Sequence, residues 1–223
     1  MVDALVSGSV PWDLQRRAGG TMRGMTFNPC SDLTAAEWIT ASDEPWWSLV
    51  TLGPPGFPAY ARLRFIPDPA YEGQPENDVV PQGDDLPEID QLRVAVETLL
   101  PHTDSSAEGY LMMWDGWGED AFPDAIVRTA RVVVPNREYY VCKVSLPDFV
   151  SGVVEASWEA RTGGDMPPPA FIWPVDRSWC ITQDVDPHWA GIGAEQAAIT
   201  SLSAQLHLDV VQVEPDQKLP FYY

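Results

Sequence analysis

Short apolar runs of strand length, cut apart by proline and glycine, constrain the fold of this chain more than any other feature. Most of the runs come in neighbouring pairs, and regular alternation of one strand with one helix is absent. The turn-forming "GPPGFP" joins the first two runs, and "PN" at 135–136 predicts a hairpin. The strands expected from these runs are 45–53, 59–67, 109–114, 130–134, 138–146, 178–186 and 208–215.

Three helices are expected between these strands. Thr34 and Glu37 form a capping box before a short helix that ends near Ser42, and Asp85 with Glu88 forms a second one. The second helix carries an apolar stripe at helical spacing, and a third helix is expected from about 194 to 206. The stripe consists of Ile89, Leu92, Val96, Leu99 and Leu100.

These elements predict an α+β fold, a mainly antiparallel sheet with about three helices packed on it. The expected division is an N-terminal arm at 1–30 and a single domain at 31–223. Inside the domain, an acidic, proline-rich loop is expected at 67–87. Between positions 68 and 90 the chain holds eight acids and no Lys or Arg.

The net charge of −20 restricts the partners that the protein can have. It arises from 33 acids against 13 bases, and such a chain repels nucleic acid backbones and anionic membranes. A basic protein partner is therefore expected, although acidity serves solubility equally well. The three cysteines are widely spaced, and no 18-residue apolar stretch occurs, so a cytoplasmic protein without a disulfide framework is expected.

The segment "WDGWGED" (114–120) is the first candidate for chemistry. Its carboxylates Asp115, Glu119 and Asp120 stand beside Trp114 and Trp117, a combination typical of carbohydrate sites. A strand-end turn whose tryptophans cover the edge of the core explains the same residues, since Asp-Gly is a turn dipeptide. Both interpretations stay open at this stage.

Other motifs are incomplete. Asp184 and Asp186 alternate at a strand end and are weak candidates for metal ligands, because no third ligand has a telling spacing. "GIGAEQ" (191–196) lacks the last glycine of a dinucleotide-binding loop. Cys30 lies before a helix start, which could lower its pKa, but no base is placed for it. We therefore expect no cofactor and no metal.

Four segments give the chain a resemblance to a widespread family of actinobacterial proteins. They are "AYARLRFIPDPAYEGQPENDV", "WDGWG", "NREYYV" and "WPVDRSWCITQDVD", in this order, and the resemblance spans roughly Leu33 to Asp186. That family has no assigned activity or catalytic residues, so the resemblance implies only a high-GC, cytoplasmic origin. In general style, small, acidic and aromatic-rich, the chain is also similar to bacterial immunity proteins.

The sequence thus favours a non-catalytic protein that binds a basic protein, as immunity factors and antitoxins do. Acids would steer the partner, and exposed aromatic side chains would anchor it. The alternatives are a carbohydrate- or small-molecule-processing enzyme that uses the "WDGWGED" carboxylates, and a nucleic-acid mimic. The predicted partner-binding residues are Asp68, Tyr71, Glu72, Glu76, Asp78, Asp84, Asp85, Asp115, Trp117, Glu119 and Asp120.

Overall fold

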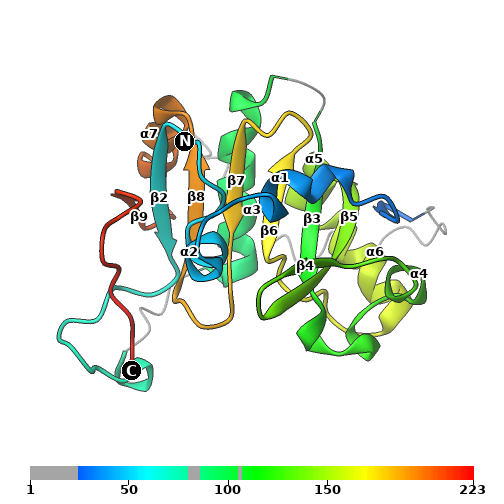
Figure 1. Cartoon of the computed structure of the whole chain (residues 1–223), viewed down its shortest axis with the longest axis horizontal. Helices are drawn as coiled ribbons and strands as arrows, with labels where there is room; N and C mark the ends of the chain where they lie inside the picture. Colours follow the sequence, from blue (N-terminus) through cyan, green and yellow to red (C-terminus); the bar gives the residue numbers. More distant parts are fainter. Residues whose placement is uncertain (1–24, 80–85, 105–106) are drawn as a thin grey trace, which may run out of the picture.

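The structure of this chain, a computed structural model, describes residues 25–79, 86–104 and 107–223. Nine strands in these ranges form one antiparallel sheet in the order β1-β5-β3-β6-β7-β8-β2-β9, and β4 pairs with the first part of β5 (Figure 1). The strands are β1 (Phe27–Pro29), β2 (Ala59–Arg64), β3 (Glu108–Trp114), β4 (Val132–Val134), β5 (Arg137–Ser145), β6 (Phe171–Pro174), β7 (Trp179–Thr182), β8 (Trp189–Ala194) and β9 (Val210–Val213).

Helices cover both faces of the sheet (Figure 1). The larger apolar layer lies under α3, α5, α6 and α7, while α1 and α2 cover the middle of the other face. On β3, Leu111 and Met113 belong to the larger layer and Met112 to the smaller one, as strand alternation requires. The helices are α1 (Glu37–Thr40), α2 (Trp46–Thr51), α3 (Glu88–Leu99), α4 (Asp124–Val127), α5 (Leu146–Val150), α6 (Val153–Thr162) and α7 (Gln196–Ser203).

The predicted fold class is confirmed, and several elements lie where the patterns placed them. The expected hairpin is β4 and β5, and its turn holds Asn136 at φ 67°, a conformation that asparagine tolerates. The apolar stripe of the second expected helix packs against the larger layer from α3. Part of the predicted arm, Phe27–Pro29, joins the sheet as β1 beside β5.

The prediction of a strand at 45–53 is wrong, because this segment forms α2. Pro45 precedes the helix with extended backbone, and Leu49 and Val50 are buried against the sheet. A short apolar run without clear alternation fits a strand and a buried helical turn equally well. The capping box at Thr34 is also absent, since Asp32 accepts the backbone N–H of Thr34 instead.

Strand β8 escaped prediction because its sequence, "WAGIGA", is rich in glycine, which weakens strand propensity. The glycines are needed for packing. A Cβ at Gly191 would lie 2.4 Å from the Thr51 carbonyl oxygen and 2.6 Å from the Leu52 Cα. The C-terminal end of α2 therefore rests directly on the backbone of β8, in a space that a side chain would fill.

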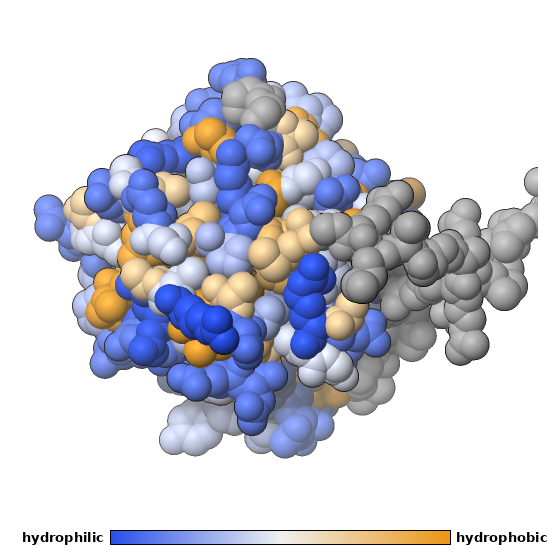
Figure 2. Space-filling model, turned by 90° about the vertical axis from the view of Figure 1, so that its right-hand side faces the viewer, coloured by the Kyte–Doolittle hydropathy of each residue, from blue (hydrophilic) through white to orange (hydrophobic). Residues whose placement is uncertain are grey.

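The described residues on the right of Figure 1 form a mixed, mainly polar surface. Figure 2 shows this face as mainly hydrophilic, with apolar residues scattered in small groups. Single apolar side chains on a surface are ordinary and mark no interface. No helix in the described ranges combines the length and apolar character that a membrane span requires.

Candidate functional site

Three acidic segments leave the sheet at the same edge. Strands β2, β3 and β7 are separated from one another by an odd number of antiparallel neighbours, so they run in the same direction and end together. The segments that follow them are 65–79, 115–121 and 183–187, and they hold four, three and two carboxylates, nine in all, with no Lys or Arg. We call these three segments the acidic edge; the first two lie at the bottom of Figure 1.

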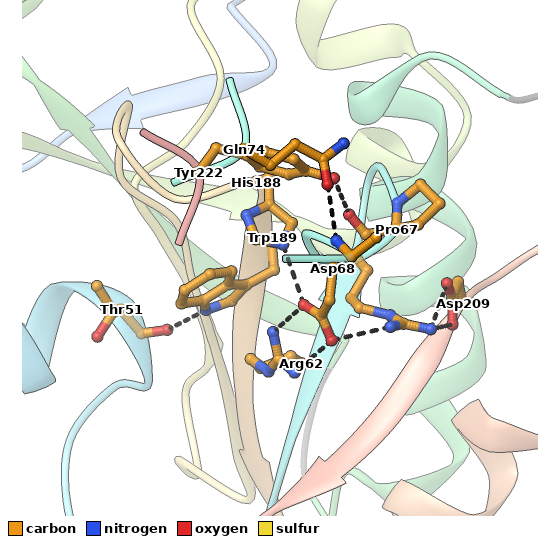
Figure 3. A network of polar contacts seen from close by, with 11 residues as sticks. Thr51, Arg62, Pro67, Asp68, Gln74, His188, Trp189, Asp209 and Tyr222 are labelled. Atoms are coloured by element: carbon orange, nitrogen blue, oxygen red, sulfur yellow. Dashed lines mark hydrogen bonds and ion pairs between the residues drawn. The ribbon is translucent and has the colours of Figure 1, made fainter. Parts of the chain in front are cut away.

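Asp68, in the first segment, is bound by three basic side chains (Figure 3). Arg62 donates to both carboxylate oxygens at 2.7 and 3.0 Å, and Arg64 adds a contact at 2.9 Å. Nε2 of His188 lies 3.0 Å from Oδ1 of the same carboxylate. Arg62 is 2% exposed, and its guanidinium also lies 4.9 Å from the centre of the Trp189 ring. Asp68 therefore neutralises buried charge on β2.

The C-terminal residues cover this network. The Tyr222 ring packs edge-on against His188, and its hydroxyl donates to the Pro67 carbonyl (Figure 3). Phe221 packs against Trp189, and the backbone N–H of Tyr223 donates to Gln74. These contacts tie the segment 65–79 to the end of the chain.

The network affects the pKa of Asp68 and the pKa of His188 for different reasons. Burial raises the pKa of Asp68, but hydrogen bonds from Arg62, His188 and Arg64 outweigh it and hold the pKa at about 2. Burial lowers the pKa of His188, and its hydrogen bond to Asp68 offsets only part of that effect. At neutral pH the pair is an ionised carboxylate beside a neutral imidazole.

The "WDGWGED" segment forms two 3₁₀ turns, Asp115–Trp117 and Glu119–Ala121, beyond the end of β3. Gly116 is required because the Trp114 indole lies across it, 2.2 Å from where a Cβ would be. Asp115 pairs with Arg131 at 2.5 Å, whereas Glu119 and Asp120 are exposed. Trp117 is 44% exposed and meets Trp114 edge-on at 6.1 Å.

A hollow lies beside these tryptophans, with an empty volume of about 300 Å³ that includes its open mouth. We call it the aromatic hollow. Its only carboxylate among the described lining residues is Asp184, and the acids Asp115, Glu119 and Asp120 lie outside the lining. Burial, and then the Asp184 carboxylate, raise the pKa of the Tyr139 hydroxyl. The lining residues are Trp114, Trp117, Tyr139, Pro168, Ala170, Gln183, Asp184 and Val185.

Arg137 occupies the place that a metal ion would take between Asp184 and Asp186. Its Nη2 lies 3.1 Å from Asp184 and 3.5 Å from Asp186, and its guanidinium lies 4.9 Å from the centre of the Trp114 ring. In the described part of the chain, no group of three or more His, Cys, Asp or Glu side chains could hold a metal ion. The two weak metal candidates are thus partners of an arginine in this structure.

Three comparisons with known proteins found no match for this chain. No family model matches it, and no curated protein and no solved structure shows significant similarity to it. The resemblance to the actinobacterial family stays a prediction.

The structure spreads the predicted partner-binding residues over the acidic edge. Tyr71, Glu72, Glu76 and Asp78 are exposed in the first segment, whereas Asp68 is held in its ion pairs. Asp115, Trp117, Glu119 and Asp120 lie in the second segment. Predicted residues Asp84 and Asp85 lie outside the described residues. Sheet order separates the first two segments by four strand spacings, about 19 Å.

No sequence pattern pointed to the remaining groups at the hollow. Tyr139 and Arg137 come from β5, Pro168 and Ala170 precede β6, and Gln183 follows β7. These positions meet only because the strands pair. Burial raises the pKa of Cys30, Cys142 and Cys180, so the pKa lowering that a helix start could have given Cys30 is not found.

Proposed function

We propose that this chain is a non-catalytic protein that binds a basic protein through its acidic edge, as an immunity or antitoxin factor binds its target. The single observation that supports this function is the convergence of nine carboxylates at one edge of the sheet. Arginines outside the three segments pair with four of them, and five are in no ion pair with a described residue. Charge of one sign on one surface attracts and orients a partner of the opposite sign. The exposed Tyr71 and Trp117 stand in two of these segments as aromatic anchors.

The same geometry gives little support to a glycosidase. That chemistry needs two carboxylates on opposite sides of one bond, about 5 to 9.5 Å apart, in a concave site. Only Asp184 among the described residues brings a carboxylate to the aromatic hollow, and Arg137 and the Val185 backbone N–H already bind it. Glu119 and Asp120 are exposed outside the hollow.

The test is a pull-down with the tagged chain from an extract of the source organism, loaded at low salt, released at high salt and identified by mass spectrometry. We expect one stoichiometric basic protein. A DNA-binding partner would favour the nucleic-acid mimic instead. No enriched protein under any growth condition would contradict the proposed function.

A charge-matched pair of variants locates the surface. Replacing Glu72, Glu119 and Asp120 with their amides removes three exposed charges from the acidic edge. The control replaces Glu37, Glu97 and Glu159, three exposed acids on α1, α3 and α6. We expect the first variant to retain much less partner than the second. Equal retention would assign binding to another surface.

A further inference from the structure

The floor of the aromatic hollow contains a buried acceptor that the fold leaves unused. Gln183 is 9% exposed, and its Oε1 has no hydrogen-bond partner among the described residues. Buried polar groups are usually paired in folded proteins. Of the seven buried side-chain atoms without a partner in the described residues, this oxygen is the one on a residue that lines the hollow. The oxygen is itself buried, so the amide must turn about its last side-chain bond before the oxygen can accept a hydrogen bond from a molecule in the hollow.

The walls of the hollow suit a flat group. Trp114, Trp117 and Tyr139 supply aromatic surface, and Pro168 and Val185 supply apolar surface. The Trp114 ring already has a guanidinium near it, that of Arg137. Trp117 meets Trp114 edge-on and is 44% exposed, so part of its indole is accessible to a ligand. Most of the 300 Å³ is the open mouth of the hollow, so a ligand has room for one flat group lying against Trp117 at the mouth and not for an oligosaccharide.

The charges around the hollow favour a cation. Arg137 is shared between Asp184 and Asp186, and Arg131 between Asp115 and Glu138, so each arginine is outnumbered by its carboxylates. Glu119 and Asp120 add two further exposed acids next to Trp117. Around the hollow there are thus six carboxylates, five from the acidic edge and Glu138 from β5, and two guanidinium groups.

We propose that the aromatic hollow is the anchor site for an arginine side chain of the basic partner. The guanidinium stacks on Trp117 and donates to Gln183 Oε1, while the surplus carboxylates neutralise its charge. Planar stacking together with directed donation distinguishes arginine from lysine at such a site. This inference rests on the proposed function, but the hollow can be tested without the partner.

The test uses Nα-acetyl-arginine methylamide as the probe and follows the tryptophan indole N–H signals by two-dimensional NMR at constant ionic strength. Acetyl-norleucine methylamide serves as the uncharged control, and methyl β-glucoside tests a sugar occupant. We expect a saturable shift of the Trp117 signal with the arginine probe alone. A shift with the glucoside and none with the arginine probe would overturn the proposal in favour of a neutral ligand. No shift with any probe would also overturn it.

Two variants connect the probe to the named groups. Gln183→Leu should weaken probe binding roughly fivefold, the ratio expected for one lost hydrogen bond. Trp117→Leu, followed at the Trp114 indole signal because the variant lacks Trp117, should weaken it by a similar factor through lost stacking. Leu206→Ala, at a side chain that is 96% exposed and outside the hollow, is the control and should bind normally. Unchanged binding by both hollow variants would overturn the proposal.

The inference and the proposed function fail in different ways. Specific binding of the arginine probe without any protein partner in the pull-down would contradict the proposed function and leave an arginine site. A stoichiometric partner whose Kd is the same for the parent chain, Trp117→Leu and Gln183→Leu would overturn the anchor site and leave the proposed function standing.

Discussion

At the scale of single residues, Asp68 has a structural role that its place in a run of acids does not suggest. It stands in a run of acids, yet it is the one acid of its segment that is bound by Arg62, Arg64 and His188. Arg62 is buried, and a buried cation is tolerated only when it is paired. Asp68 therefore contributes chiefly to stability, and its exposed neighbours Glu72, Glu76 and Asp78 carry the proposed binding.

Asp68→Asn should lower the free energy of unfolding at pH 7 by about 2–4 kcal/mol, because it leaves Arg62 without its anionic partner. Urea unfolding of the parent chain and the variant measures this loss of stability. The depressed pKa of Asp68 stabilises the folded chain above the ordinary value of 3.8, and this contribution is lost as the pH falls through about 2. The difference between parent and variant should therefore shrink across that window. Asp78→Asn, at an exposed acid, should change stability by less than about 0.5 kcal/mol.

His188 makes a separate contribution to pH dependence. Its folded pKa is lowered, so the unfolded chain takes up a proton first as the pH falls below the ordinary value of 6.5. The stability associated with neutral His188 is present above that value and is lost progressively below it. His188→Gln retains a nitrogen donor for Asp68 but cannot titrate. The decrease in Tm from pH 7.5 to 5 should therefore be smaller in this variant, and an equal decrease in both proteins would refute this role.

At the scale of elements, close approach of backbones decides the position of α2. Its C-terminal residues lie on β8 at Gly191, Thr182 of β7 donates to the Val50 carbonyl, and the Trp189 indole donates to Thr51. These contacts explain why an apolar run that could have added a strand forms a helix over the sheet. In this position α2 buries its own side chains Leu49 and Val50 against the sheet.

Gly191→Ala should destabilise the chain by about 1–3 kcal/mol, the usual cost of forcing extra volume into a packed interior. Its Cβ would meet the backbone of Thr51 and Leu52, which cannot move aside as a flexible side chain can. Gly164→Ala is the matched control, because nothing lies within 4 Å of its Cβ. Equal unfolding midpoints in urea for the two variants would show that α2 does not rest on β8 in this way.

At the scale of the whole molecule, strand order gathers part of the negative charge at one edge of the sheet. The chain carries −20 overall, and three segments from distant parts of the sequence bring nine of its 33 acids to one edge. A charge surplus spread evenly would improve solubility with little orienting effect. Concentrated at an edge next to an aromatic hollow, it can steer a basic surface into a defined orientation.

The association rate with the captured partner should therefore fall at least roughly tenfold between low and high salt, because screening shortens the reach of the acidic edge. The dissociation rate should change much less. Surface plasmon resonance measures both rates. The Glu119→Gln/Asp120→Asn variant should show a shallower salt dependence than the Glu97→Gln/Glu159→Gln control. An on-rate independent of ionic strength would argue against electrostatic steering.

The sequence by itself determined the features that local periodicity encodes. Alternation in the strands, helical spacing in α3 and turn residues in the β4–β5 hairpin led to an α+β fold with an antiparallel sheet. The acidic character of the three segments of the acidic edge can also be read directly from the sequence. Where an element is defined by what packs on it, as with α2 and the glycine-rich β8, local pattern failed because the deciding contacts are distant in sequence.

Only the tertiary structure decided which residues share a site. Gln183 and Arg137 had no telling motif. Gln183 shares the hollow with Trp117, and Arg137 lies over Trp114, because β5, β3, β6 and β7 are neighbours in the sheet. The same pairing gave Asp68 three basic partners and left Glu119 and Asp120 exposed. Composition can count charges and aromatic rings, whereas strand order determines which of them neutralise one another and which face a partner.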